Sequence, residues 1–269
     1  MTQLYHLFLY FIIYSVIGWM CEVVYCSVPQ KRFVNRGVLR GPLCPIYGCG
    51  GLLVIFALQD FTENPFSVFC VGVLLTSTLE YITSFLMEKL FHARWWDYSD
   101  KKFNLNGRVC LLNSLLFGLL SLVLMYGLHP FVVRIVAGLP EKGLAILFWC
   151  VLVIFLADVA AATIDGLKLR QKLSRMNENL EKLKLELQKR NLAGDLSLAK
   201  MSAYLKNQGL DDKVKKLILQ HKKSITEMHF SERRLVRAFP EITIKKFPEA
   251  LHDLKKHMAK KANKKNKLL

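Results

Sequence analysis

Long apolar runs alternate with short polar segments over the first 165 residues of the chain. A helix that crosses a bilayer needs about 20 mostly apolar residues. Four runs meet that length: Leu4–Tyr25, Phe66–Leu86, Val109–Leu128 and Gly143–Ile164. A fifth run, Cys44–Leu58, is shorter and follows a proline-rich stretch. By length alone it fits either a crossing helix or a loop that re-enters the bilayer.

The positions of the basic residues favour a crossing for this fifth run. Lysine and arginine gather in the connections that lie on the cytosolic side of a membrane. We call residues 26–43, between the first run and residue 44, the first connection, and residues 87–108 the third connection. If residues 44–58 cross, these two connections share one side with the C-terminal tail. They hold most of the Lys and Arg of the connections. The pattern therefore predicts five spans, with the N-terminus outside and the tail in the cytosol.

Composition adds that the chain has two parts of different character. It is 52% hydrophobic, yet its formal net charge is +17. Residues 1–165 contain 11 Lys and Arg against 10 Asp and Glu, whereas residues 166–269 contain 27 against 11. We therefore predict an all-α protein, in which a membrane helix bundle at 1–165 precedes a basic cytosolic tail.

The tail begins with a heptad pattern. Apolar residues recur at spacings of four and three, as in a coiled-coil seam: Leu169, Leu173, Met176, Leu180, Leu183 and Leu187. The pattern predicts a coiled-coil helix over residues 166–191, separated from the last span only by Gly166. Its partner is either a second copy of the chain or the later helices of the same tail, and the prediction is a parallel homodimer.

Residues 192–269 show shorter amphipathic and basic helical patterns. One covers Asp211–Ile225, one begins at Ser231 as N-cap, and one follows Pro248. They fit either a small helical domain or helices that lie on anionic lipid. Lys255–Lys267 holds seven lysines and no acid, and is expected to be disordered. Nucleic acid is not the expected partner, because the positive-inside rule and lipid contact already account for the charge.

Acidic residues within the predicted spans indicate a polar region between the helices. Glu22 shares a helix face with Ser15 and Gly18, and Glu80 shares one with Thr76 and Thr83. Ionisable residues in spans usually face the bundle interior. They predict either a polar cavity towards the cytosolic side or structural bonds between helices.

The first and third connections carry further polar residues that the topology places near these two acids. The candidate ligand-binding set is Glu22, Asn35, Arg36, Glu80, Asp97, Asn104 and Arg108. Its mixed charge suits a zwitterionic or anionic ligand, or a structural plug closed by salt bridges. No Ser-His, Cys-His or metal-ligand spacing stands out, and the seven cysteines fit packing thiols. We therefore predict no catalytic residue, no metal site and no cofactor.

Four of these stretches resemble one protein family. They are Gly18–Glu22, Asn35–Gly48, Trp95–Ser99 and Phe103–Arg108. Residues 5–165 are similar to the ABC-transporter type IV, CmpB-like family of bacterial membrane proteins. The resemblance implies a multi-pass protein of the bacterial cell membrane and a part in transport. It implies no particular substrate, catalytic residue or cofactor.

Three functions remain open at this point. The first is a permease-like transport component. Because the sequence has no G-x4-G-K-[ST] phosphate loop, ATP hydrolysis would then come from a separate subunit. The second is a membrane enzyme that acts on a lipid or its head group through the carboxylates. The third is a membrane-anchored regulatory or scaffold protein. The transport component is the prediction.

Overall fold

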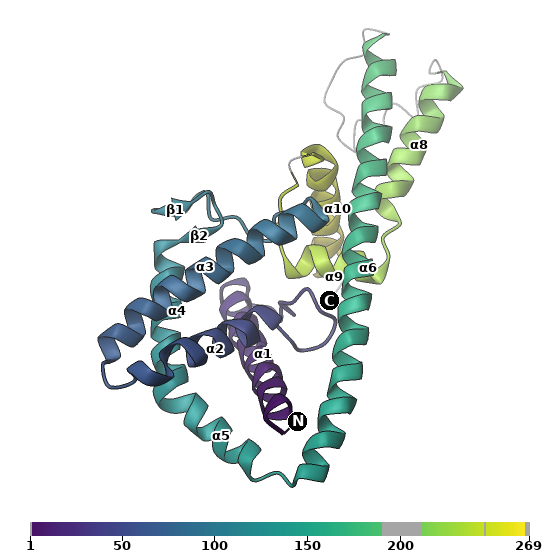
Figure 1. The fold of residues 1–269 in the computed structure, drawn as a ribbon. Coiled ribbons are helices and arrows are strands. Elements are labelled where there is room, and N and C mark those ends of the chain that lie inside the picture. Colours follow the sequence, from purple (N-terminus) through teal and green to yellow (C-terminus); the bar gives the residue numbers. More distant parts are fainter. Residues whose placement is uncertain (1, 190–210, 245, 267–269) are drawn as a thin grey trace.

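The computed structural model describes residues 2–189, 211–244 and 246–266, and Figure 1 shows their arrangement. The first half contains α1 (Thr2–Gln30), α2 (Pro45–Leu58) with a short 3-10 turn η1 (Gln59–Phe61), α3 (Pro65–Phe91), α4 (Leu111–Val123), the π-helical turn η2 (Leu124–Leu128) and α5 (His129–Ala137). The second half contains α6 (Glu141–Gln188), α8 (Asp212–Thr226), α9 (Phe230–Ala238) and α10 (Pro248–Asn266). Residues 190–191 of the predicted coiled-coil helix, and residues 192–210, 245 and 267–269 of the predicted tail, lie outside the described residues.

Four helical stretches are long and apolar enough to cross a membrane: Thr2–Gln30, Pro65–Phe91, Leu111–Ala137 and Glu141–Gln188. The prediction of a polytopic all-α membrane fold is confirmed. The apolar stretch Pro45–Phe61 is shorter, so a fifth crossing stays a prediction. Apart from the helices, the described residues form one small antiparallel pair, β1 (Asn104–Leu105) with β2 (Val109–Cys110).

The stretch Leu111–Ala137 runs nine residues further than the sequence pattern predicted, which ended at Leu128. Its backbone widens into the π-helical turn Leu124–Leu128, directly before Pro130. Proline has no N–H to donate to the preceding turn, and π-turns accommodate such an interruption within a helix. The helix therefore continues as α5 instead of ending.

The membrane bundle has its own apolar core. Tyr14, Leu58, Val68, Val132 and Leu144 are buried together, and they come from α1, α2, α3, α5 and α6. The short helix α2 packs against both α1 and α3. The core therefore holds α2 inside the bundle although α2 is half the length of its neighbours.

The helix α6 is continuous for 48 residues. In the sequence, Gly166 is the only break between the last predicted span and the heptad pattern, and the helix runs through it. Gly166 is buried, and a Cβ placed there would lie 2.5 Å from the ring of Phe91 at the end of α3. The glycine therefore serves close packing between two helices, and α6 joins the membrane bundle to the tail as a single rod (Figure 1).

The heptad seam of α6 is covered by the chain's own later helices. Leu180, Leu183 and Leu187 form a cluster with residues of α8. Leu169, Leu173 and Met176 pack with residues of α9, α10 and the segments between them. All six seam residues are at most 2% exposed. The structure therefore favours the intramolecular alternative, because it leaves none of these positions on the surface for a homodimer.

The tail helices form a small helical domain, the alternative to lying on lipid. Their apolar faces pack inside the protein, where Val214, Ile218, Leu235 and Leu254 are fully buried. Two details correct the sequence prediction. The N-cap of α9 is His229, whose capping box with Glu232 replaces the cap expected from Ser231. The helix α10 extends to Asn266, over a stretch expected to be disordered, because it continues from the packed turn that contains Leu254.

We predict that Leu173→Ala opens the tail domain. Leu173 is fully buried in the seam, and truncating such a leucine costs about 2–5 kcal/mol. Trypsin cleavage of the native full chain, which reports the population of the opened state, should therefore become faster after residue 166. Leu185→Ala is the matched control, because Leu185 lies on the same helix and is 57% exposed. Equal cleavage rates for the two variants would contradict the packing described.

Candidate functional site

A cavity of about 650 Å³ lies inside the membrane bundle. Its walls come from α1, α2, α3, α4, η2 and α6, from the first and third connections, and from Phe239 in the segment that follows α9. Aliphatic and aromatic side chains make up most of the lining. A cavity of this size and character, with a few polar groups, is typical of a small-molecule site.

Two tyrosine–glutamate pairs form the polar part of the cavity. The hydroxyl of Tyr47 donates to Oε1 of Glu22 at 2.8 Å. The hydroxyl of Tyr98 donates to Oε1 of Glu80 at 3.3 Å. Burial raises the pKa of the Tyr98 phenol well above its usual value, so it keeps its proton and remains the donor. Each carboxylate therefore has one oxygen fixed by a phenol.

The remaining oxygens of these two carboxylates differ. Oε2 of Glu22 lies 3.6 Å from Nε of Arg36, so a cation accompanies this acid. Oε2 of Glu80 is buried and has no hydrogen-bond partner among the described residues. The cavity therefore contains one compensated and one uncompensated acid.

Glycines on α1 and α2 bring the first of these pairs together. A Cβ on Gly18 would lie 2.2 Å from Cβ of Tyr47, and a Cβ on Gly48 would lie 2.3 Å from Oγ of Ser15. Small residues allow two helix backbones to approach this closely. The close contact places Tyr47 next to Glu22, one turn further along α1 from Gly18.

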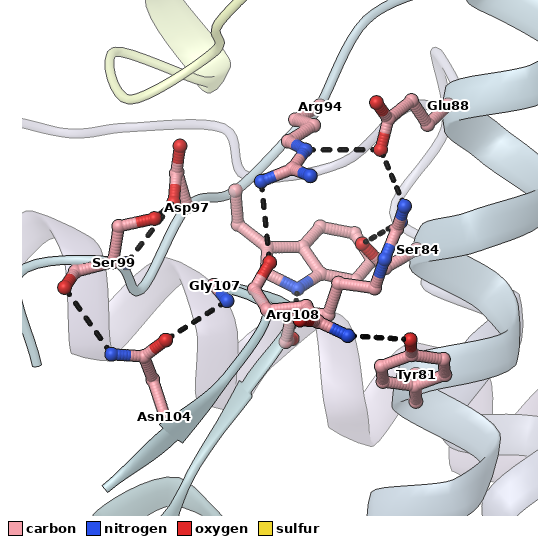
Figure 2. Close-up of polar contacts among 11 residues, drawn as sticks. Tyr81, Ser84, Glu88, Arg94, Asp97, Ser99, Asn104, Gly107 and Arg108 are labelled. Atoms are coloured by element: carbon pink, nitrogen blue, oxygen red, sulfur yellow. Dashed lines mark hydrogen bonds and ion pairs between the residues drawn. The ribbon is translucent and has the colours of Figure 1, made fainter. Parts of the chain in front are cut away.

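The third connection forms a separate polar cluster outside the cavity, drawn in Figure 2. Oε2 of Glu88 accepts from Nε of Arg94 at 2.9 Å and from Nη2 of Arg108 at 2.6 Å. Arg108 also donates to Oγ of Ser84 at 3.2 Å. One acid between two arginines is the closed plug that the sequence analysis named as an alternative.

Asp97 and Asn104 hold the loop that carries this cluster (Figure 2). Oδ1 of Asp97 accepts from the backbone N–H of Ser99 at 3.0 Å. Oδ1 of Asn104 accepts from the backbone N–H of Gly107 at 2.9 Å. Burial raises the pKa of the Asp97 carboxyl, but the hydrogen bonds from Ser99 and the charge of Arg94 outweigh it and hold this pKa below its usual value. The side chains of Asp97 and Asn104 therefore stabilise the conformation of the loop backbone.

The seven predicted site residues therefore fall into two groups. The cavity is lined by Glu22, Arg36 and Glu80. Asn35, Asp97, Asn104 and Arg108 do not line it; Asn35 instead accepts from Nε1 of Trp19 at 2.8 Å and ties the first connection to α1. The residues that the sequence analysis did not select are Tyr47 and Tyr98. Both stand inside the quoted motifs, but nothing in the sequence indicates that they pair with the two acids.

The tail is anchored on the first connection, beside the cavity. The guanidinium of Arg234 on α9 donates to three successive backbone carbonyls, those of Gly37 (3.0 Å), Val38 (2.6 Å) and Leu39 (2.7 Å).

Arg36 makes the return contact from the first connection to the tail. Its Nη1 donates to the carbonyl of Ala238 at 3.0 Å, and its guanidinium lies 4.8 Å from the ring centroid of Phe239. Phe239 is part of the cavity wall. The tail thus contributes directly to the cavity, which a reading of the tail as a lipid-bound appendage did not anticipate.

Within the described residues, no group of three or more His, Cys, Asp or Glu side chains is placed to hold a metal ion. The chemistry that the cavity offers therefore consists of two carboxylates, their tyrosine donors and a large apolar surface. It fits recognition of a bound molecule.

Comparison with known proteins identifies one family. The family model described as "Putative ABC-transporter type IV" matches residues 9–163. No curated protein and no solved structure matches the chain.

We predict that Arg234→Gln loosens the tail from the first connection. Hydrogen bonds from a charged donor each stabilise by about 1.5–3 kcal/mol, so the amides of residues 36–40 should exchange with deuterium about tenfold faster or more. Hydrogen–deuterium exchange of the full chain in lipid nanodiscs measures this. Arg237→Gln is the control, since Arg237 is exposed on the same helix. Unchanged exchange in the Arg234 variant would show that this contact does not hold the tail.

Proposed function

The chain belongs to the ABC-transporter type IV family, and from this premise we propose that it is a permease-like transport component whose cavity receives the solute. The location of the cavity is the observation that supports this proposal. All residues that line it lie within the matched stretch 9–163, with the exception of Phe239. The cavity is therefore built almost entirely from the part of the chain that matches the family model.

ATP hydrolysis would come from a separate ATPase subunit. The family description refers to ABC transporters, in which transport is coupled to ATP, whereas this sequence contains no phosphate-binding loop. A P-loop needs its glycines, lysine and Ser/Thr to cradle phosphates and magnesium. In this proposal the present chain binds the solute, and a separate subunit binds and hydrolyses ATP.

We also propose five crossings, in the cell membrane of a bacterium, with the N-terminus outside and the tail in the cytosol. Contacts of the tail with both the first and the third connection support this topology. Arg234 contacts the backbone of residues 37–39, and Thr243 exchanges backbone hydrogen bonds with Arg94. These contacts support placing both connections on the side of the tail, and in that arrangement Pro45–Phe61 crosses together with α3.

A cavity-filling substitution tests the transport proposal. Leu79 lines the cavity from α3, and Leu79→Trp places an indole in its space. The indole takes up space that the solute would occupy. A loss of about 1.4 kcal/mol in binding corresponds to a factor of ten, so solute uptake should fall about tenfold. Proteoliposomes that contain the full chain and an ATPase subunit encoded beside it should be screened with a panel of labelled solutes.

Leu74→Trp is the matched control for this experiment. It makes the same substitution on the same helix, at a residue that does not line the cavity and is 67% exposed. We expect uptake at the level of the unmodified chain. The proposal is wrong if no solute of the panel moves with any co-encoded ATPase, or if the two tryptophan variants transport equally well.

A further inference from the structure

Among the described residues that line the cavity, Glu80 is the one with a buried side-chain oxygen that has no hydrogen-bond partner. Its side chain projects from α3 into the cavity and the residue is only 5% exposed. Tyr98 occupies Oε1, and Oε2 has no partner among the described residues. A buried carboxylate without a compensating donor is costly in an apolar environment. The site is therefore incomplete as the chain alone builds it.

The other buried or half-buried acids at this end of the bundle all have donors. Glu22 has Arg36, Glu88 has Arg94 and Arg108, and Asp165 has Arg40, which donates to both carboxylate oxygens at 2.9 Å. Asp158 accepts the backbone N–H groups of Arg40 and Gly41 at 2.8 Å each. Glu80 differs from these acids because it has neither a cation nor a second hydrogen-bond donor among the described residues.

The described part of the chain does not supply a cation for Glu80 from the cavity wall. Of the described residues in the lining, Arg36 is the basic one, and none is a lysine. Arg36 is already held by Glu22, by the carbonyl of Ala238 and by the ring of Phe239. Among the described residues, none is placed to pair with Glu80 as a cation, so a ligand is the source that we consider.

We propose that the cavity binds an apolar molecule that carries one protonated amine, with an ammonium N–H donated to Oε2 of Glu80. This inference rests on the proposed function and names the chemical class of its solute. Trp96 and Tyr98 are among the aromatic residues that line the cavity, and a cation is attracted to an aromatic ring face. The aliphatic and aromatic walls provided by α4 and α6 receive the apolar body.

The same charges disfavour the ligand classes that the sequence suggested. A zwitterion or an anion needs a cationic group on the protein, and Arg36 is committed to three contacts within the chain. Bringing a ligand carboxylate near the uncompensated Glu80 would place two negative charges together in an apolar cavity. A protonated amine would bring the net charge of the pair to zero, whereas an anion would add a second negative charge.

Calorimetric titration of the full chain in lipid nanodiscs tests this assignment with two probes of equal shape. Phenylbutylamine carries the ammonium group, and phenylbutanol has the same apolar body without charge. We expect the amine to bind about tenfold tighter or more, as a charge-assisted hydrogen bond in a buried site should provide. In Glu80→Gln the two probes should bind with equal affinity.

Glu178→Gln is the control for loss of a carboxylate, because Glu178 lies far along α6 and its side chain is 67% exposed. It should keep the preference for the amine. Elution profile and melting temperature establish that Glu80→Gln folds, and neutralising an uncompensated buried acid is not expected to lower stability. If the unmodified chain binds both probes equally, or Glu80→Gln keeps the preference, the inference is overturned without reference to folding.

Leu79→Trp separates this inference from the proposed function. If both probes bind equally well and Leu79→Trp removes both, the cavity is a ligand site and only the assignment of an amine fails. If neither probe binds, the amine assignment also fails, and the proteoliposome uptake assay decides the proposed function on its own. Tight binding of the amine that depends on Glu80 and is lost in Leu79→Trp supports both.

Discussion

Backbone polar groups that are buried away from water must be paired within the protein, because an unpaired buried group costs free energy. The first connection meets this requirement with charged side chains from distant parts of the chain. Asp158 on α6 accepts the N–H groups of Arg40 and Gly41, and Arg234 on α9 donates to the carbonyls of residues 37–39. The tail is therefore built into the membrane domain, and the positive charge that distinguishes it is partly used as hydrogen-bond donors.

This requirement also determines the chemistry of the cavity. Arg36, which belongs to the same connection, is drawn to Glu22 and to the carbonyl of Ala238. The second acid of the cavity, Glu80, is left with a phenol on one oxygen and nothing on the other among the described residues. The arrangement that satisfies the first connection therefore leaves one oxygen of a buried acid without a partner in a largely apolar cavity, and the proposed preference for an amine rests on this oxygen.

Sequence patterns predicted where the helices lie better than which segments pack against them. The apolar runs identified the four long membrane helices, and the polar faces around Glu22 and Glu80 indicated the cavity that both acids line. The heptad seam was correct as a buried stripe, yet periodicity does not distinguish a second copy from α8 of the same chain. Asp97, Asn104 and Arg108 resembled a binding set because a closed hydrogen-bond network and an open site use the same residue types. Only their three-dimensional contacts separate the two.

The central claim is that the bundle encloses a cavity whose uncompensated carboxylate is completed by a ligand. An experimental density map of the full chain in lipid nanodiscs, prepared with phenylbutylamine, tests it most directly. The account predicts density for the amine inside the cavity, with its nitrogen at hydrogen-bond distance from Oε2 of Glu80. A map in which the helices close the cavity and a side chain of the protein itself pairs with Glu80 would contradict it.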